Sequence, residues 1–260
     1  MTNFKYLQKL FFLLVMGFSL SFICFCGDDE EDEPVQNPNE EIINPTDSIP
    51  SEDVPVVPND SVADGGTIVV NGYEAVDLGL SVKWATCNVG ANAPEEYGGH
   101  YAWGETEEKS DYTEYTYKYV RDLDGDRNYW DDEDNWMNIG SNISGTQYDV
   151  AHVKWGGSWR MHTLDELKEL VNKCSWKWTS LNGVSGQLVT GPNGNSIFLP
   201  AAGYRYGTDL YYRGSRGYYW SATLSEYSSF YAYSLYFNDN PWSYDDYYRN
   251  RGLTVRPVTE

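Results

Sequence analysis

The chain has 260 residues and a formal net charge of −21, with 39 Asp and Glu against 18 Lys and Arg. An acidic surface repels phosphate backbones, so this balance argues against nucleic acid as a partner. The length allows one or two domains, and all 10 Trp lie beyond residue 65, which separates an aromatic body from what precedes it.

Residues 1–26 have the layout of a secretory signal. Two lysines, Lys5 and Lys9, precede the apolar run LFFLLVMGFSLSFICFC, which spans residues 10–26. A positively charged start followed by a long apolar segment is typical of an exported protein. The alternative is a retained membrane anchor, because 17 apolar residues lie at the short limit of what spans a bilayer.

The end of this apolar run resembles a bacterial lipoprotein signal, in which a cysteine is acylated and becomes the first residue of the mature chain. Cys26 fits that role better than Cys24, because Ile23 lies three residues before it and Gly27 follows it. The acidic residues 28–33 resemble the surface-export signal of lipoproteins from gut-type Gram-negative bacteria. The sequence thus predicts a surface-exposed outer-membrane lipoprotein, held in the membrane by its N-terminal lipid. Two ordinary buried thiols are the alternative.

Residues 27–64 are expected to form an acidic, proline-rich, disordered linker. They hold 13 Asp and Glu, six of the 11 prolines, and no basic or aromatic residue. Such a segment cannot bury enough apolar surface to offset its ordering entropy. Ser48 and Ser61, in DSI and DSV, resemble acceptor serines for O-glycosylation in the same bacterial group. Chance alone is the alternative, because the patterns are short and the segment is rich in their residues.

Residues 65–260 read as one strand-rich α+β domain with one or two short helices and long loops. Asn71-Gly72 is a strong short hairpin signal and predicts a turn between two strands, followed by another strand. HYAWGET (100–106) and GYYWSAT (217–223) each place Tyr and Trp two residues apart, on one face of a strand. Two late strands are predicted at SLYFN (234–238) and LTVRPV (253–258).

One helix is predicted over about residues 164–172. Thr163 and Glu166, three residues later, match a capping box at its start. The apolar positions that follow recur at helical spacing and predict one buried face. These positions are Leu164, Leu167, Leu170 and Val171.

Six blocks of sequence, in this order, resemble the major paralogous domain family first named for Fibrobacter succinogenes and the related DUF1566-type domains. They are VDLGLSVKWATCNVGA, EEYGGHYAWGE, WGGSWRMHTLDELKEL, IFLPAAGYR, GYYWSAT and GLTVRPV. The resemblance covers about residues 66–260 and implies a C-type-lectin-like fold. That family is similar in turn to formylglycine-generating enzymes, whose W-R-x-P-T-x-x-E block the chain echoes with His162 in place of the proline. A fold of this kind says little about activity.

Cys87 and Cys174 are the only thiols of residues 65–260. An even pair of cysteines in an exported protein predicts a disulfide between them. Two separate buried thiols are the alternative. A copper-dependent oxidase built on this pair would need further Cys or His ligands beside it, and the sequence shows none.

The acidic loop DLDGDRNYWDDE suggests calcium as a possible cofactor. Asp122, Asp124, Asp126 and Glu133 fall at positions 1, 3, 5 and 12 of an EF-hand-like loop. Arg127 stands where such a loop requires glycine. A solvated acidic loop is the alternative, and no other cofactor is predicted.

No catalytic motif stands out in residues 65–260. His100, His152 and His162 are each expected to be structural, and the Gly-x-Ser-x-Gly, His-Glu-x-x-His and Cys-x-x-Cys patterns are absent from this part of the sequence. The loops GPNGN (191–195) and YFNDN (236–240) are loosely similar to the calcium motifs of lectins but lack their Glu and Trp. We therefore predict a protein that is not an enzyme.

Two stretches, YRYGTDLYYRGSRGYYW (204–220) and YFNDNPWSYDDYYRNR (236–251), alternate Tyr and Trp with Gly, Asn, Asp and Arg. Such loops suit recognition, because a flat ring offers an apolar face and a polar edge at low entropy cost. Filling the core is the alternative for any single ring. The predicted ligand-binding residues are Tyr206, Tyr211, Tyr212, Arg213, Trp242, Tyr244, Tyr247, Tyr248 and Arg249.

Together these features predict a lipid-anchored, non-catalytic cell-surface protein that binds an extracellular ligand, either a glycan or a protein. The first alternative is an enzyme related to formylglycine-generating proteins, which would need a reactive cysteine pair or a metal cluster. The second alternative is a purely structural cell-surface or adhesin component with no small ligand.

Overall fold

The computed structural model describes residues 67–121, 132–240 and 243–260, all within the compact unit Pro58–Glu260. Among these residues, no helix has the length and hydropathy to cross a membrane. Several predicted features lie outside the described residues: the segments 1–26 and 27–64, and the sites Cys26, Ser48, Ser61, Asp122, Asp124, Asp126 and Trp242.

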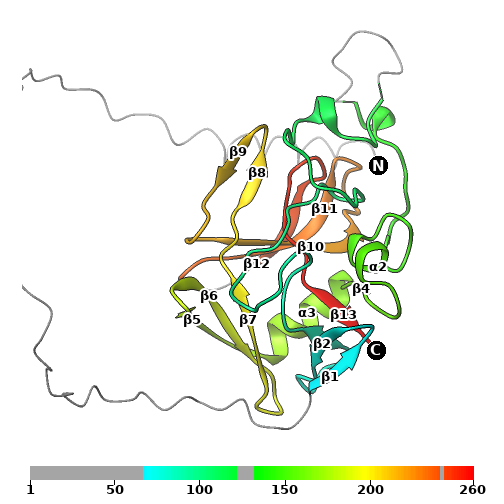
Figure 1. Ribbon diagram of the computed structural model, residues 1–260. Helices are drawn as coiled ribbons and strands as arrows, with labels where there is room; N and C mark the ends of the chain where they lie inside the picture. Colours follow the sequence, from blue (N-terminus) through cyan, green and yellow to red (C-terminus); the bar gives the residue numbers. More distant parts are fainter. Residues whose placement is uncertain (1–66, 122–131, 241–242) are drawn as a thin grey trace, which may run out of the picture. The chain divides into compact units, whose positions relative to one another are not determined.

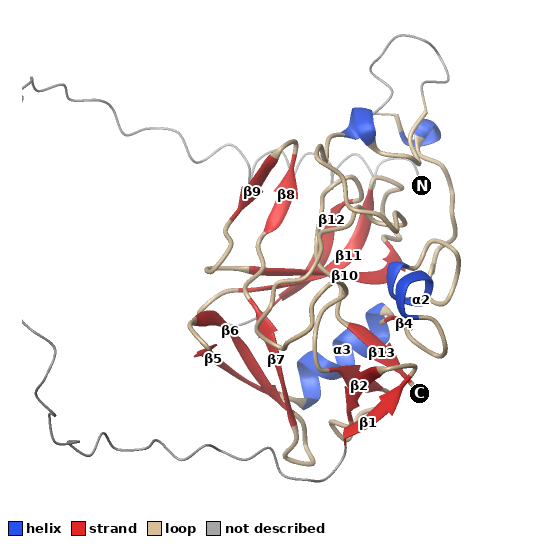
Figure 2. Cartoon of the chain, in the orientation of Figure 1, coloured by secondary structure: helices blue, strands red, loops and turns tan. Residues whose placement is uncertain are grey.

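The described residues form antiparallel strands and two α-helices, which confirms the strand-rich α+β class predicted from the sequence (Figure 1, Figure 2). The helices are α2 (Val150–Trp155) and α3 (Leu164–Lys173), with 3-10 turns η1 (Glu114–Thr116) and η2 (Glu133–Asn135). The strands are β1 (Thr67–Val70), β2 (Tyr73–Val76), β3 (Lys83–Ala85), β4 (Arg160–Met161), β5 (Ser175–Leu181), β6 (Val184–Thr190), β7 (Ser196–Pro200), β8 (Tyr204–Tyr206), β9 (Asp209–Tyr211), β10 (Gly217–Leu224), β11 (Tyr231–Phe237), β12 (Ser243–Tyr248) and β13 (Pro257–Thr259). They pair in the orders β1-β2-β3-β13-β4, β10-β11-β12, β5-β6-β7 and β8-β9.

β1 and β2 form the hairpin that Asn71-Gly72 predicts. Asn71 has a φ of 47° and Gly72 a φ of 86°, and a type I′ turn needs positive φ at both of these positions. The pair Val70 and Tyr73 closes the turn. β2 then pairs with β3, which confirms the strand predicted after the hairpin.

The five-stranded sheet is completed from the far end of the body. β13 pairs with β3 on one side and with β4 on the other, so it joins strands that are distant in the sequence (Figure 1). The predicted strand 253–258 is confirmed only in its last residues, because regular pairing begins at Pro257.

The strand predicted at residues 100–106 is wrong. Tyr101 makes one isolated bridge to Leu253, and the next backbone donor of the segment, the Trp103 N–H, turns to a loop carbonyl instead. Gly104 then takes a φ of 85°, which ends the extended conformation. Tyr101 and Trp103 are nevertheless both buried, so the two-residue spacing of these rings reflects core packing and not a strand.

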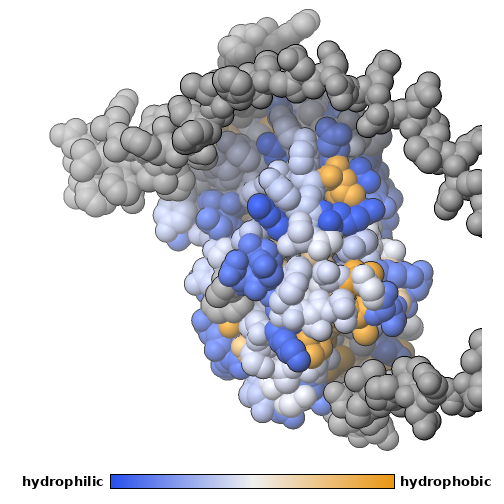
Figure 3. All heavy atoms as spheres, turned by 90° about the vertical axis from the view of Figure 1, so that its left-hand side faces the viewer, coloured by the Kyte–Doolittle hydropathy of each residue, from blue (hydrophilic) through white to orange (hydrophobic). Residues whose placement is uncertain are grey.

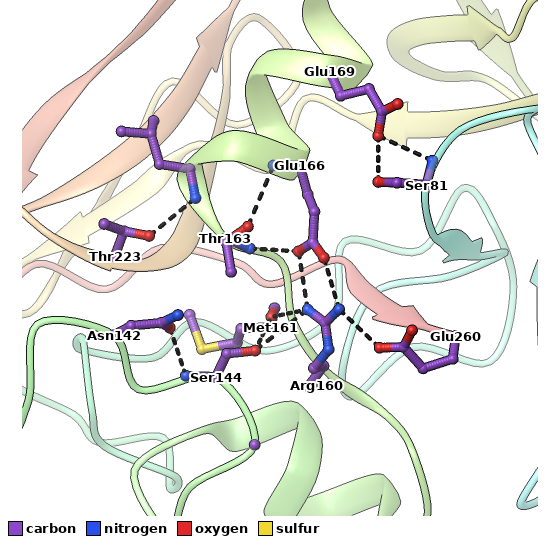
Figure 4. A network of polar contacts seen from close by, with 12 residues as sticks. Ser81, Asn142, Ser144, Arg160, Met161, Thr163, Glu166, Glu169, Thr223 and Glu260 are labelled. Atoms are coloured by element: carbon purple, nitrogen blue, oxygen red, sulfur yellow. Dashed lines mark hydrogen bonds and ion pairs between the residues drawn. The ribbon is translucent and has the colours of Figure 1, made fainter.

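The start of α3 is held by the predicted capping box. The Thr163 hydroxyl accepts a hydrogen bond from the Glu166 N–H at 3.3 Å, and the Glu166 carboxylate accepts one from the Thr163 N–H at 2.8 Å. Arg160 of β4 donates two bonds of 2.9 and 2.6 Å to the same carboxylate, and Figure 4 shows these groups converging. The predicted helix and its apolar face are confirmed, with three side chains fully covered: Leu167, Leu170 and Val171.

β10 lies between two of the three hydrophobic clusters of the described core. Trp220 and Ala222 face a cluster that includes α2, whereas Tyr219 faces the apolar side of α3. Every residue from Gly217 to Ala222 is buried, as expected for a strand covered on both faces. The strand predicted at GYYWSAT is therefore confirmed.

Arg256 is a buried guanidinium that ties three segments together. It donates to the Asn88 side-chain oxygen at 2.8 Å, to the carbonyls of Ala85 and Thr86 at 3.0 Å each, and to the Phe198 carbonyl at 2.9 Å. These partners are all neutral, and burial lowers the pKa of Arg256. Its four donated bonds offset the loss of hydration that burial imposes.

Candidate functional site

The β8–β9 hairpin carries the first part of an aromatic surface. Tyr204 and Tyr211 are cross-strand partners, and their ring centroids lie 5.4 Å apart. The chain enters the hairpin through Gly203, whose φ is 69°, and a Cβ there would lie 2.1 Å from the Tyr211 carbonyl oxygen. Only glycine allows this close approach, so Gly203 helps to set the position of the hairpin.

The hairpin packs on the β10-β11-β12 sheet through Tyr204. The Tyr204 ring meets Tyr218 of β10 at 5.0 Å and Tyr247 of β12 at 5.4 Å. Tyr218 also meets Tyr236 of β11 at 5.1 Å. Edge-to-face and tilted pairs at these distances are favourable beyond the area that they bury, so the inner rings form a rigid support.

Four further rings of this region are exposed. We define the tyrosine cluster as the four supporting rings Tyr204, Tyr218, Tyr236 and Tyr247 with the four exposed rings Tyr206, Tyr211, Tyr212 and Tyr248. The exposed fractions of the last four are 37%, 36%, 44% and 41%. Tyr212 has a φ of 58°, a left-handed conformation that aromatic residues rarely adopt and that often marks a functional position.

Two arginines lie against exposed rings of the cluster. The guanidinium carbon of Arg251 lies 3.2 Å from the Tyr206 ring centroid and 5.6 Å from that of Tyr248. The guanidinium carbon of Arg216 lies 3.9 Å from the Tyr212 ring centroid. A hydrogen bond with Tyr218 raises the pKa of Arg216. The cluster therefore presents aromatic faces and positive charge together.

Two of the supporting tyrosines, Tyr218 and Tyr247, keep their hydroxyl protons. Burial raises the pKa of Tyr218 and, more strongly, that of Tyr247. At neutral pH both groups can therefore donate a hydrogen bond as well as accept one.

β5, β6, β8 and β9 lie at the left of Figure 1, and Figure 3 shows the body with that side facing the viewer. The part not covered by grey atoms is mostly pale or blue, with orange only in scattered small groups. An aliphatic docking patch does not dominate this face, so recognition here would depend on rings and polar groups.

The structure brings together five of the predicted ligand-binding residues: Tyr206, Tyr211, Tyr212, Tyr247 and Tyr248. Tyr248 alternates with Tyr247 along β12, so its ring lies on the other face of the strand. There it meets Tyr231 at 4.5 Å, and it reaches the cluster through Arg251. Tyr247 belongs to the support rather than to the exposed rim, because it is only half-exposed among Tyr204 and Tyr218.

Two predicted residues lie apart from these five. Tyr244 is exposed, but its ring faces Lys168 of α3, whose ammonium lies 5.8 Å from the ring centroid. Arg213 is exposed over Tyr97, 5.0 Å from that ring centroid. They add no contact to the cluster.

Arg249 is a correction to the predicted site. It is only 1% exposed, and its guanidinium donates to the Tyr117 hydroxyl at 3.0 Å, the Ser229 carbonyl at 2.9 Å and the Met137 carbonyl at 3.2 Å. Its guanidinium carbon also lies 4.9 Å from the Trp103 ring centroid. With each nitrogen paired inside the protein, Arg249 is structural and is not available to a ligand.

Sequence reasoning missed Tyr204, Tyr218, Arg216 and Arg251. Tyr204 and Tyr218 both lie in the Tyr-rich stretch 204–220. Their alternation with other residues along β8 and β10 could have indicated which strand face they share. The arginines carried no signal of their own, because their contacts depend on the fold. Arg216 meets Tyr212 across the turn that follows β9. Arg251, which follows β12, meets Tyr206 of β8.

The predicted disulfide is also corrected, because Cys87 and Cys174 are free thiols. Cys87 packs in the core cluster of α2 and donates to the Ala91 carbonyl at 3.4 Å. Cys174 packs against the other cluster, that of α3. Burial raises the pKa of both thiols, that of Cys174 to about 11, which disfavours the reactive thiolate.

Of the four predicted calcium ligands, Glu133 alone lies among the described residues, and it is exposed in η2. Within the described ranges, no group of three or more His, Cys, Asp or Glu side chains could hold a metal ion. In the loop 191–195, the side-chain amides of Asn193 and Asn195 both donate to the Asp77 carbonyl at 2.8 Å. These amides serve to anchor the loop.

Two of the histidines are buried and neutral. His100 Nε2 lies 3.1 Å from the Ala202 carbonyl oxygen, and His162 Nδ1 lies 3.2 Å from the Arg256 carbonyl oxygen. Burial lowers the pKa of each imidazole to about 4. Their hydrogen bonds to backbone carbonyls indicate packing roles.

The opposite side of the β8–β9 hairpin has its own feature. Arg205 alternates with Tyr204 and Tyr206 along β8, so it projects from the other face. There it lines an open depression of about 680 Å³, whose walls are Glu108, Lys109, Ser110, Arg205 and Thr208. Lys109 is paired with the buried Glu105 at 2.9 Å.

Comparison with known proteins adds one match. A family model described as "Domain of unknown function (DUF8237)" matches residues 169–258, about a third of the chain. The matched segment runs from within α3 to β13 and includes the whole tyrosine cluster. No curated protein and no solved structure matches the chain.

Proposed function

We propose that the protein is a lipid-anchored, non-catalytic binding protein on the outer surface of a Gram-negative bacterium. Cys26 carries the lipid, residues 27–64 form a disordered acidic linker, and the body recognises an extracellular glycan or protein. Support comes from the apolar run that ends at Cys26 and from the acids that follow it. Acids at that place stay out of hydrocarbon and away from anionic headgroups, so they hold the body off the membrane.

The tyrosine cluster is the observation that carries the binding proposal. Rigid rings such as Tyr206 and Tyr212 lose little entropy on binding, and the packed rings beneath them fix their positions. Four neighbouring rings are more than a third exposed, and a contiguous group of exposed rings is typical of a surface that binds a ligand or a partner.

We further propose that the body has a C-type-lectin-like fold of the major paralogous domain family. In support of this, the sequence blocks that carry the resemblance coincide with the core. Trp84, Trp159, Phe198, Trp220 and Val255, one from each of five blocks, are all buried.

Tyrosine variants test the binding proposal. We would screen the full-length chain in detergent on a glycan array and against extracellular proteins, and then measure affinity for each hit. Tyr206→Ala and Tyr212→Ala should each weaken binding by about 1–2 kcal/mol, as truncation of an exposed aromatic anchor does. Tyr227→Ala is the matched control, because Tyr227 is 76% exposed and outside the cluster.

Two results would count against a binding role for the cluster. In one, no glycan or protein binds. In the other, a ligand binds equally well to Tyr206→Ala, Tyr212→Ala and Tyr227→Ala. A chain that binds nothing would instead fit a purely structural surface component.

The anchor has a separate test. In a Gram-negative host fed an alkyne fatty acid, the wild-type chain should incorporate the label, Cys26→Ala should lose it, and Cys24→Ala should keep it. External protease should degrade the body on intact cells. An unlabelled chain that is freely soluble in the periplasm would refute the proposal.

A further inference from the structure

The two arginines of the tyrosine cluster are held in a shape that suits an anionic group. A guanidinium that lies flat against a ring keeps its N–H donors at its edge, and that planar fork matches carboxylates and sulfates in a bidentate way. Arg251 and Arg216 lie only 3.2 and 3.9 Å from the centroids of Tyr206 and Tyr212. Stacking thus orders both side chains before a ligand arrives.

Neither arginine has a carboxylate partner within the described part of the chain. The ion pairs found there use other cations, namely Lys109, Lys154, Arg160, Lys168 and Lys173. The chain has 39 acids for 18 bases, yet among the residues that the structure describes no acid pairs with either of these two cations. Asp209 is the acid nearest in sequence on this face of the hairpin, and it faces the Tyr211 hydroxyl at 3.5 Å.

One donor of Arg251 also lacks any partner. Its Nη1 atom is shielded from solvent and makes no hydrogen bond to any residue in the described ranges. An unpaired buried donor is unfavourable by about 1–3 kcal/mol. Because Nη1 is shielded in the free protein, the Arg251 side chain would have to shift to present this donor to a ligand oxygen. That contact would remove the penalty, which gives an anion a reason to bind here rather than at any exposed lysine.

We propose that the ligand of the tyrosine cluster is an anionic polysaccharide, with Arg216 and Arg251 binding its carboxylate or sulfate groups. The proposal rests on the binding function proposed above and narrows it to one ligand class. The exposed rings of Tyr211 and Tyr248 would take the apolar faces of the sugars, while the two guanidinium groups take the acidic substituents. Because the chain as a whole has a net charge of −21, its long-range field disfavours a polyanion, and the two stacked guanidinium groups give this cluster a local advantage.

Calorimetry with a matched pair of oligosaccharides tests the ligand class. The probes are a galacturonic acid hexamer and the same hexamer with its carboxylates reduced to alcohols, titrated into the full-length chain in detergent. We expect the acidic hexamer to bind at least tenfold more tightly than the reduced one. Raising NaCl from about 0.05 M to about 0.5 M should weaken the acidic hexamer only, since screening acts on charge.

Arginine variants test the assigned residues. Arg216→Gln and Arg251→Gln should each weaken the acidic hexamer by about tenfold or more and leave the reduced hexamer unchanged. Arg251→Lys keeps the charge but loses the planar fork, so it should fall in between. Arg205→Gln, on the other face of the same hairpin, is the matched control and should change binding less than twofold. Unchanged thermal unfolding would show that each variant is folded.

The outcomes separate this inference from the proposed function. If both hexamers bind equally and the Tyr206→Ala variant weakens both, the binding function stands and the anionic class is refuted. If Arg205→Gln weakens the acidic hexamer as much as Arg216→Gln does, general charge attraction explains the binding and the assigned residues are wrong. If the acidic hexamer does not bind but a neutral glycan from the array does, the inference also fails.

Discussion

Arg249 and Arg251 lie two residues apart, and each places a guanidinium against aromatic rings, yet their surroundings differ. Around Arg249, Trp103, Tyr117 and Trp136 close off solvent, and all three nitrogens donate hydrogen bonds. Around Arg251, the rings are exposed and Nη1 has no partner. The same residue type therefore has all of its nitrogens paired in the core at one position and stacks on partly exposed rings at the other.

The difference lies in whether the donors are satisfied. A buried and fully paired guanidinium contributes to stability, and its removal leaves carbonyl oxygens unpaired. A stacked guanidinium with free donors contributes little to stability, because an exposed cation–π contact is worth only about 0.5–1 kcal/mol. Stability measurements should therefore separate the two sites, as the following four predictions show.

The largest contrast is expected between Arg249→Met and Arg251→Met. Arg249→Met should lower the free energy of unfolding by about 3–4 kcal/mol, because the Ser229 and Met137 carbonyls lose a charged donor. Arg251→Met should lower it by at most about 1 kcal/mol. Urea denaturation of the two variants measures both values, and equal losses would contradict the distinction between the sites.

The second prediction concerns two buried imidazoles, whose contribution to stability depends on pH. The pKa of His100 and that of His162 are each about 4 in the fold, against 6.5 for a free imidazole. Between those values the unfolded chain binds more protons, so the stability contributed by each neutral imidazole is present above pH 6.5 and is lost as the pH falls towards 4.

His162→Gln isolates one of these contributions. Between pH 7 and pH 4 the free energy of unfolding of the wild type should fall by on the order of 2–3 kcal/mol more than that of the variant. Urea midpoints measured across this range give the difference. Parallel pH profiles would show that His162 does not titrate on unfolding as its burial implies.

A single hydroxyl group gives a finer test. Tyr117→Phe removes the acceptor of the Arg249 Nε–H and the donor to the Trp103 carbonyl, which are bonds of 3.0 and 2.7 Å. The loss should be about 2 kcal/mol, because a buried charged donor is left unpaired. Tyr206→Phe, at the exposed site, is the control and should change stability by less than about 0.5 kcal/mol. A loss as large in the control would remove the basis of the comparison.

The smallest effect is expected from Arg216→Gln. Arg216 has no ion pair within the described residues, so its stability change should stay within about 0.5 kcal/mol. Differential scanning calorimetry measures this value on the same samples used for binding. A loss of several kcal/mol would make Arg216 a structural residue like Arg249.

Local signals predicted those parts of the fold that local chemistry decides. Asn71-Gly72 forms a tight turn because both residues tolerate positive φ. Thr163 and Glu166 cap α3 because each side chain bonds to the backbone of the other residue, three positions away. Neither outcome depends on a distant segment. GYYWSAT forms β10 as predicted, and distant segments cover both of its faces.

The failures all depend on distant segments. Whether Cys87 can reach Cys174 is decided by which core cluster each joins. Residues 100–106 carry a strand-like pattern, but only Tyr101 has a partner, at Leu253.

The candidate site shows the same limit. The sequence picked out the exposed Tyr206, Tyr211 and Tyr212, because the Tyr-rich hairpin is local. It placed Arg249 in the site and omitted Arg251, although both lie in the short stretch YRNR after β12. Nothing within that stretch shows which side chain turns inward, because Trp103 and Met137, which receive Arg249, lie more than a hundred residues earlier.

The position of β13 has a consequence for how the protein is made. Because β13 joins β3 to β4, a ribosome must deliver almost the entire body before these two strands can be bridged. Until then the backbone edges of β3 and β4 lack their neighbour, so the five-stranded sheet is still open. Clipping residues 257–260 should therefore leave a product that is prone to degradation by housekeeping proteases.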